Sequence, residues 1–355
     1  MMTKKLPLRE FYVHGYLCNA YPLSILQDNS TTEAWFYSNF IQLACAGDFP
    51  DGKFFSFYNT NVAWYEFFLN CPLLNYQKIN YTFMDNYKDG IKGFIIDSIN
   101  KEQYIYLYID EFYISHKKSY QTVNMPHEML IIGYNIGESK EFIVSGYDKD
   151  MIYGEYTITF AEFDKAFNSL DRNLYNRSYV YLMSYDENES YEFDIKLVLQ
   201  SLKELRYSVN TSLNFRAYNS PANWIYGISV YDHVIKYLEY NILELKEKVD
   251  IRIFHTIYEH KSAMAKRVIY LKKKNYLMKN SNIDEKYAEL ENISKNNRNG
   301  VIKYNMRENE AMIRSIIGKI EQIKVLETSI LEELISELEE NEPNYNDVLS
   351  DKYYL

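Results

Sequence analysis

Residues 127–148 read HEMLIIGYNIGESKEFIVSGYD. Two apolar runs flank the polar, turn-forming segment 135–140, and this pattern predicts a β-hairpin. In a paired hairpin, the start of the first strand and the end of the second lie side by side. We therefore expect His127 and Asp148 to meet, with the carboxylate orienting the imidazole.

The rest of the first half also reads as short strands and helices. Tyr104–Ile109 alternates Tyr with Ile or Leu, which predicts a strand. Tyr156–Phe160 predicts a further strand, and Ala161–Leu170 predicts a short helix after it. The aromatic segments Trp35–Leu43 and Val62–Leu69 are also expected to be helical.

The second half reads as one helix after another. Apolar residues recur at helical spacing over 231–245, 254–271 and 313–338, which indicates a bundle with its core on these stripes. The segments 219–221 and 296–300 are rich in Asn, Ser, Pro and Gly, and we expect them to separate the helices.

A chain of 355 residues is longer than one core usually organises. The acidic, polar segment 186–189 is the natural linker. We therefore predict an α+β protein with an N-terminal domain over 1–188, built on an antiparallel sheet, and a helical domain over 189–355.

Bulk composition narrows the function. The net charge of −10 and the pI of about 5.3 argue against a nucleic-acid partner. An odd, small number of cysteines is typical of a reducing compartment, and no apolar run reaches the length of a signal peptide or membrane span. We expect a cytoplasmic protein without a membrane partner. No Cys/His cluster has zinc spacing and no phosphate-binding loop occurs, so we expect no metal and no cofactor of its own.

Cys18 is the strongest candidate nucleophile. Pro22 is tolerated only in a first helical turn, so Cys18 should lie near the start of a helix, where unpaired N–H groups favour a thiolate. Cys45 and Cys71 read as small buried hydrophobic residues. His127 is the candidate base, with His116 as the alternative. The histidines of the second half, at 233, 255 and 260, read as bundle residues.

Cys at a helix start, His at a strand start and Asp at the end of the next strand is the order of papain-like folds. The chain resembles the peptidase C39-like group, and more closely the butirosin-type acyltransferases. The residues that carry this resemblance are HGYLCNA at 14–20, IDEFY at 109–113, HEMLIIGY at 127–134, FIVSGYD at 142–148, YGISVYD at 226–232 and EHK at 259–261.

The resemblance implies a papain-like cysteine-protease fold with a Cys18, His127 and Asp148 triad, used for acyl transfer. Its members move an acyl group from the phosphopantetheine thioester of a carrier protein, through an acyl-cysteine, to an amine in nonribosomal natural-product biosynthesis. A diamine is one acceptor that the resemblance suggests for this chain. A cysteine peptidase or amidase of the same fold is the alternative. A non-catalytic binding protein on a decayed papain scaffold is a third reading.

One departure from the C39 pattern concerns the oxyanion hole. C39 peptidases have a Gln six residues before the nucleophile, and here that position is Tyr12. We expect the backbone N–H of Cys18 to act with another donor, Tyr12 or His14. Because a thioester is already activated, the missing Gln weakens the peptidase reading more than the acyltransferase reading.

Two charged segments suggest binding roles. Asp110 and Glu111 end a strand upstream of His127 and could hold a cationic amine; the alternative is a solvated loop pair. The segment 261–279 is basic, and we expect it to dock an acidic carrier protein. Its docking candidates are Lys261, Lys266, Arg267 and Lys273. The alternative is a solvated helix flank paired with the acidic segment 332–342.

Overall fold

The computed structural model describes residues 2–47, 54–59, 71–174, 177–214, 224–245, 247–307 and 309–341. The fold is α+β, with two compact units. Met1–Thr32 and Tyr65–Tyr191 form the first, here called the sheet unit; Glu33–Trp64 and Glu192–Leu355 form the second, the helical unit. The second junction lies close to the expected boundary at 188, but the division into two continuous blocks did not anticipate that 33–64 belong to the helical unit.

The sheet unit is built on an antiparallel seven-stranded sheet, counted over the described residues, in the order β4-β9-β5-β6-β7-β8, with β1 paired to β6. Its strands are β1 Thr3–Lys5, β4 Leu74–Asn80, β5 Tyr104–Asp110, β6 Pro126–Asn135, β7 Glu141–Tyr147, β8 Tyr153–Thr159 and β9 Tyr179–Tyr185. The predicted hairpin is confirmed as β6 and β7, and the predicted strands at 104–109 and 156–160 as β5 and β8.

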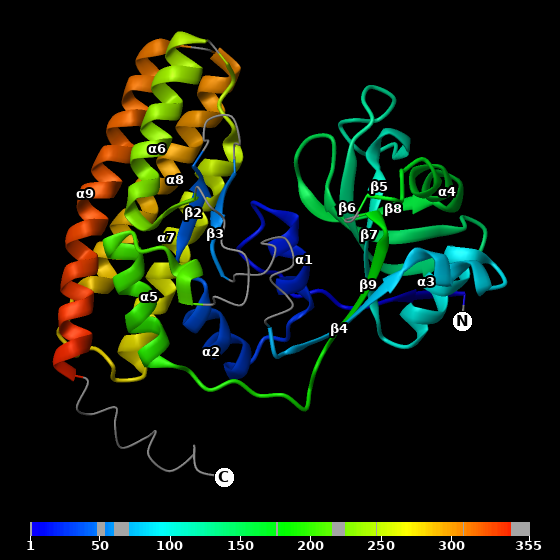
Figure 1. Ribbon diagram of the computed structural model, residues 1–355, viewed down its shortest axis with the longest axis horizontal. Helices are drawn as coiled ribbons and strands as arrows, with labels where there is room; N and C mark the ends of the chain where they lie inside the picture. Colours follow the sequence, from blue (N-terminus) through cyan, green and yellow to red (C-terminus); the bar gives the residue numbers. More distant parts are fainter. Residues whose placement is uncertain are drawn as a thin grey trace. The chain divides into compact units, whose positions relative to one another are not determined.

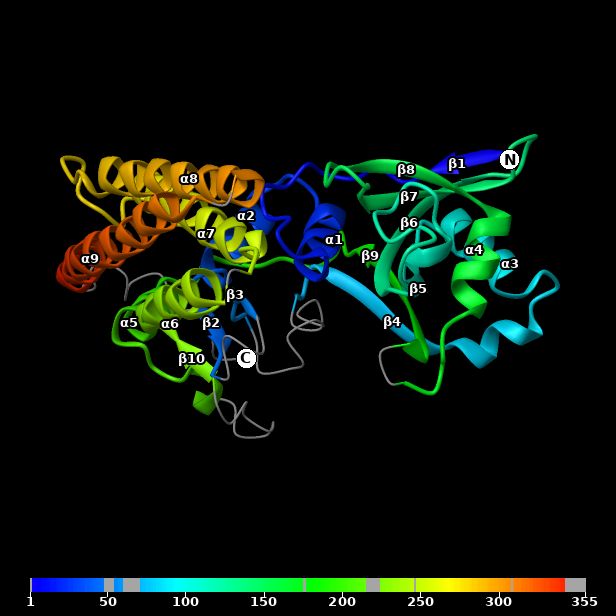
Figure 2. The same ribbon diagram turned by 90° about the horizontal axis from the view of Figure 1, so that it is seen from above.

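Helices lie on both faces of this sheet, with α1 on one side and α3 and α4 on the other (Figures 1 and 2). They are α1 Leu17–Ile25, α3 Gly90–Asn100 and α4 Phe160–Asn168; the 3-10 turns are η2 Tyr81–Asn86 and η3 Glu111–Tyr113. Side chains along a strand point alternately to the two faces of the sheet, so the strands can pack against helices on both sides. Tyr106 of β5 meets Tyr21 of α1 edge to face at 6.1 Å. On the other side, Phe142 of β7 packs on Phe163 of α4 at 5.0 Å.

The helical unit combines a small sheet, in the order β10-β2-β3, with long helices. Its elements are α2 Ser30–Asn39, which begins in the sheet unit, β2 Leu43–Ala46, β3 Phe55–Phe57, α5 Ile195–Tyr207, η5 Thr211–Asn214, β10 Trp224–Tyr226, η6 Gly227–Ser229, α6 Val230–Tyr237, the π-helical η7 Leu238–Glu244, α7 Ile251–Lys273, α8 Ile283–Arg307 and α9 Glu310–Asn341. The pairing of Trp224 with Ala46 explains why a segment of the first half belongs to this unit.

The predicted apolar stripes are confirmed, since they lie on α6, η7, α7 and α9. The predicted break at 296–300 is wrong, because these residues lie within α8. Packing against α7 and α9 outweighs the weak helix propensity of Asn and Gly. Asn297 is buried there, and its Nδ2 donates to the carbonyl of Ile316 at 3.4 Å.

Two other expectations need adjustment. The helix predicted over Trp35–Leu43 ends at Asn39, and Leu43 begins β2. The segments 62–69 and 219–221 lie outside the described residues.

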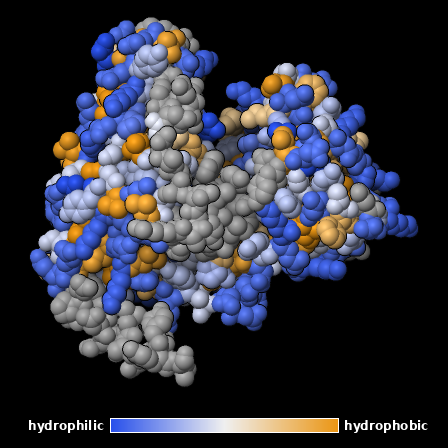
Figure 3. Space-filling model, viewed as in Figure 1, coloured by the Kyte–Doolittle hydropathy of each residue, from blue (hydrophilic) through white to orange (hydrophobic). Residues whose placement is uncertain are grey.

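On the face seen in Figure 3, hydrophilic residues cover much of the α9 region with single hydrophobic residues among them. Of the described helices, none is both long and apolar enough to cross a membrane.

Candidate active site around Cys18 and His127

Cys18 is the second residue of α1, as predicted from the sequence. The chain before the helix is extended at Tyr16, and the carbonyl of Tyr16 accepts the N–H groups of Asn19 and Ala20, each at 3.0 Å. The N–H groups of Asn19 and Cys18 are directed at the thiol and act to lower its pKa. Pro22 lies deeper in the helix than the expected first turn. Since Pro22 has no N–H, the carbonyl of Cys18 receives no i+4 helical hydrogen bond.

The thiol of Cys18 is protonated in the resting structure. The residue is only 4% exposed, and burial raises its pKa well above the usual range. The negative charge of Glu128 raises the pKa further and outweighs the backbone N–H groups. A nucleophilic role for Cys18 would therefore require a base that removes this proton.

Glu111 and His127 form a hydrogen-bonded pair of a carboxylate and an imidazole. Nδ1 of His127 lies 3.0 Å from Oε1 of Glu111. Burial opposes protonation of the imidazole, but the hydrogen bond to Glu111 and the charges of Glu128 and Glu111 outweigh it and raise the pKa of His127. On the other partner, burial acts to raise the pKa of Glu111, but His127, Lys117 and Ser119 together lower it.

The carboxylate that orients His127 is Glu111, and the expectation that Asp148 does so is wrong. At this end of the hairpin, β6 and β7 are last paired at Leu130 and Ser145, and the chain then turns towards β8. There Oδ1 of Asp148 accepts the N–H groups of Asp150 and Ile152, both at 2.9 Å.

Strand β5 explains why Glu111 reaches the imidazole. It stays paired with β6 through Ile109 opposite His127 and Asp110 opposite Pro126. The next residue, Glu111, donates its N–H to the carbonyl of Met125 at 3.0 Å. The register of β5 against β6 thus delivers this carboxylate beside His127.

Buried polar groups hold Glu111 in place. Oε2 of Glu111 accepts from the hydroxyl of Ser119 at 3.1 Å. Nζ of Lys117 lies 3.4 Å from Oε1 of Glu111 and donates to the carbonyl of Tyr147 at 2.6 Å. Gly146, with φ +151°, makes room for this group, because a Cβ there would lie 2.8 Å from the Tyr21 hydroxyl and 3.4 Å from Nζ of Lys117.

Glu128, which was not singled out in the sequence, acts on both His127 and Cys18. Its Oε2 is 3.7 Å from Nε2 of His127, the imidazole nitrogen not engaged by Glu111. The charge of Glu128 also acts on Cys18, on Tyr21 of the same helix and on Tyr106 of β5. Among the described residues, no hydrogen bond joins Cys18 to His127. Glu128 thus contacts Nε2 of His127, which is the nitrogen that would accept the proton of the Cys18 thiol.

The two candidate oxyanion residues lie in the segment before α1. Tyr12 stacks on Phe11, with ring centroids 4.8 Å apart. His14 stacks on Tyr153 at 5.3 Å, and its carbonyl accepts from the hydroxyl of Tyr147 at 2.9 Å. Burial lowers the pKa of His14 against the charge of Glu10, so its imidazole is neutral at pH 7. These contacts anchor the segment on β7 and β8.

Asp110 is committed to the backbone. Its Oδ1 accepts the N–H of Phe112 at 3.0 Å and that of Met125 at 2.9 Å. Asp110 therefore folds the chain after β5 back onto the start of β6. With Glu111 engaged by His127, neither carboxylate of the pair is available for an amine, contrary to the expectation from the sequence.

The alternative base, His116, stacks on Tyr156 at 4.9 Å. Burial and the charge of Lys117 lower its pKa to about 4. Within the part of the chain that the structure describes, neither ring nitrogen has a hydrogen-bond partner. His127, not His116, therefore has the carboxylate that a general base requires.

The basic segment on α7 divides into buried and exposed residues. Lys261 and Arg267 are 0% exposed, so the expectation that they dock a carrier is wrong. Lys261 pairs with Glu327 of α9, and Arg267 donates to the carbonyls of Tyr37 and Phe40 at 2.8 and 2.6 Å. The other two candidates, at 266 and 273, are exposed. The alternative pairing with 332–342 holds only at the end of this segment, where the N–H of Met278 donates to Glu337 and the carbonyl of Tyr276 accepts from Asn341. The glutamates at 332, 333 and 339 pair instead with Arg206, Lys286 and Lys203.

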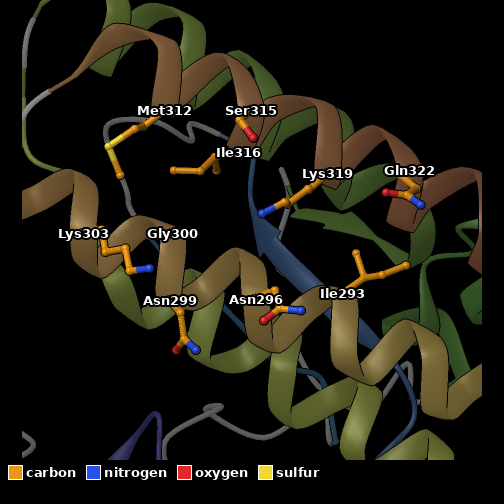
Figure 4. Close-up of a pocket in the computed structure, with 10 residues that line it drawn as sticks. All are labelled: Ile293, Asn296, Asn299, Gly300, Lys303, Met312, Ser315, Ile316, Lys319 and Gln322. Carbon is orange, nitrogen blue, oxygen red and sulfur yellow. The ribbon is translucent and has the colours of Figure 1, made fainter.

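A groove of about 510 Å³ lies between α8 and α9 in the helical unit (Figure 4). Lys303 of α8 and Lys319 of α9 line it together with Asn, Ser and Gln side chains. Neither lysine has an ionic partner among the residues that the structure covers. No candidate from the sequence lines this groove.

Over the described ranges, no group of three or more His, Cys, Asp and Glu side chains is arranged to hold a metal ion. No protein-family model matches the chain, and no curated protein matches it either.

Proposed function

We propose that this chain is a thioester-dependent N-acyltransferase on a papain-like scaffold. It transfers an acyl group from the phosphopantetheine of a carrier protein to Cys18, and from Cys18 to an amine, forming an amide. The observation that carries the proposal is the Glu111–His127 pair in the same unit as a cysteine at the start of α1, with backbone N–H groups directed at its sulfur.

The protonated state of Cys18 suits a thioester better than a peptide. His127 must take the thiol proton as the sulfur attacks, and its raised pKa makes the imidazolium a stable product of that transfer. A thioester then expels a thiolate, which leaves without a strong acid. A peptide bond needs a protonated amine as leaving group and a well-stabilised oxyanion. The absence of a Gln before Cys18 suits the first reaction.

The test is intact-mass spectrometry after incubation with an acyl-pantetheine thioester. We expect one acyl adduct, located on Cys18 by peptide mapping, and its discharge to an amide when an amine is added. Cys18→Ala should give no adduct, whereas Cys71→Ala, which removes another buried thiol of the sheet unit, should behave like the unmodified protein.

Other outcomes would decide for the alternatives. Efficient cleavage of a peptide library, with no amide from any pair of thioester and amine, would favour the cysteine peptidase or amidase. An unreactive Cys18 towards both thioesters and peptides, in a protein that binds an acyl-carrier protein, would favour the non-catalytic scaffold.

For the carrier, we propose that the exposed Lys266 and Lys273 of α7 are the docking residues that remain from the basic segment. Carrier proteins of this kind are acidic, and charge complementarity accelerates encounter more than it adds affinity. Because the whole chain carries a net negative charge, an acidic partner is attracted to this local basic surface and repelled by much of the rest.

A further inference from the structure

The carboxylate of Glu128 is half-buried and has few partners of its own. Its side chain is 14% exposed, and its one ionic contact is Nε2 of His127 at 3.7 Å. No donor among the described residues forms a hydrogen bond to it. A half-buried carboxylate without a donor keeps its lone pairs available, so a positive group that enters the site can pair with it.

The neighbours of Glu128 supply no fixed cation. The buried Lys117 is held by Glu111 and by the carbonyl of Tyr147. Cys18, Tyr21 and Tyr106 are protonated, neutral groups whose anionic forms Glu128 disfavours. When His127 is neutral, Lys117 balances the charge of Glu111, and no cation among the described residues contacts Glu128.

We propose that Glu128 binds the ammonium group of the acceptor amine, and that the acceptor is therefore a primary amine that arrives as a cation. This inference rests on the proposed acyl transfer. A primary ammonium is compact and has three donors, so it can pair with Glu128 while lying next to the sulfur of Cys18. It would fill the role that the sequence suggested for Asp110 and Glu111, both of which are engaged elsewhere.

The transfer step then balances as follows. The ammonium gives one proton to the Glu128 carboxylate and becomes a neutral amine. Its nitrogen attacks the acyl carbonyl carbon on Cys18, a C–N bond forms, and the C–S bond breaks. The second nitrogen proton passes through His127 to the leaving sulfur, and Glu128 releases its proton to water. The products are an amide, the Cys18 thiol and one proton.

The experiment separates the two half-reactions in Glu128→Gln. Acylation of Cys18 by an acyl-pantetheine thioester is measured first, and discharge is then followed from the preformed acyl-enzyme, so that a change in acylation does not enter the discharge rate. Discharge to n-alkylamines and α,ω-diamines should fall by about ten- to a hundredfold, the loss expected for one charged hydrogen bond. Discharge to hydroxylamine, which is uncharged at neutral pH, should change little.

Glu155→Gln is the matched control, because it removes the same charge from a sheet residue that pairs with Lys5 at the surface. Glu128→Asp, which keeps the carboxylate, should recover part of the discharge to alkylamines. Equal losses with alkylamines and hydroxylamine, or no loss with either, would overturn the assignment.

A binding measurement keeps this inference distinct from the proposed function. Diamines should slow alkylation of Cys18 in the unacylated protein, and Glu128→Gln should abolish this protection while Glu155→Gln keeps it. Protection without any acyl adduct would retain the amine site and reject acyl transfer. An acyl adduct without protection in the unmodified protein would reject the amine site and retain acyl transfer.

Discussion

Each unit contains a buried charged cluster, and the two clusters differ in completeness. In the helical unit, Lys261 is held by Glu327 and by Nδ1 of His260 at 2.8 Å, and Tyr231 donates to Glu327 at 2.7 Å. The side chains of Lys261, Glu327 and His260 are 0% exposed, and Tyr231 is also fully buried. In the sheet unit, His127 remains 33% exposed and Glu128 has no hydrogen-bond donor among the described residues.

The comparison teaches how to distinguish a structural cluster from a site. A buried ion pair whose remaining groups are satisfied can be stable, but it offers no place for a ligand. A cluster with an exposed base and an unsatisfied charge can accept a substrate. Of the two clusters, only the one in the sheet unit therefore has the properties of an active site, and the variants below test that contrast.

The largest effect is expected at His127. His127→Ala should lower the rate of Cys18 acylation by about a hundred- to ten-thousandfold, the usual contribution of a general base. The melting temperature should change little, because the imidazole is partly exposed. Stopped-flow acylation together with thermal unfolding gives both values. An unchanged acylation rate would remove His127 from the mechanism.

The opposite pattern is expected at Lys261. Lys261→Met leaves the charge of Glu327 buried without its cation, and this should lower the free energy of unfolding by about 3–5 kcal/mol. The double variant Lys261→Met, Glu327→Leu should recover much of that loss, since no uncompensated charge remains. Denaturant titration measures both. If the single variant is as stable as the starting protein but inactive, the helical cluster is functional and the contrast fails.

Local periodicity made much of the fold predictable from the sequence. The hairpin, β5, β8 and the apolar stripes follow from alternation or from helical spacing. The small sheet of the helical unit could not be predicted that way, because it depends on pairing Trp224 with Ala46 across the sequence. In strand β4, every residue after Leu74 is exposed or half-buried, and the strand therefore lacks an apolar pattern.

The candidate site was predictable only in part. The order of Cys18 and His127 along the chain was informative, whereas the choice of Glu111 over Asp148 required the register of β5 against β6. Glu128 follows His127 directly in a strand, where alternation predicts opposite directions. The burial of Lys261 did have a signal, because it falls on the apolar stripe of α7 at helical spacing.

A smaller effect is expected in the pH dependence of the site. Glu111 raises the pKa of His127, so the neutral imidazole that accepts the thiol proton forms only above that raised value. The acylation rate should therefore fall as the pH drops through it. In Glu111→Gln, the hydrogen bond and the charge that raise the pKa of His127 are lost, while burial and Lys117 still lower it. The acidic limb of the pH–rate profile should therefore move to lower pH. A limb that stays in place in the pH–rate profile would argue that Glu111 does not pair with His127 in solution.

The smallest effect is expected at the exposed lysines of α7, because surface charges are screened and act mainly on encounter. Lys266→Glu with Lys273→Glu should lower the rate of acylation by an acyl-carrier protein by about tenfold at low salt, within the range that steering supplies. Acylation by a small acyl-pantetheine thioester should be unchanged.

Lys303→Glu with Lys319→Glu makes the same charge change in the groove between α8 and α9 and serves as the control. Since both pairs lie outside the buried clusters, neither should alter the melting temperature much. If the groove pair lowers the carrier-dependent rate and the α7 pair does not, the carrier docks at the groove; if both rates fall equally, overall charge and not a defined surface guides the encounter.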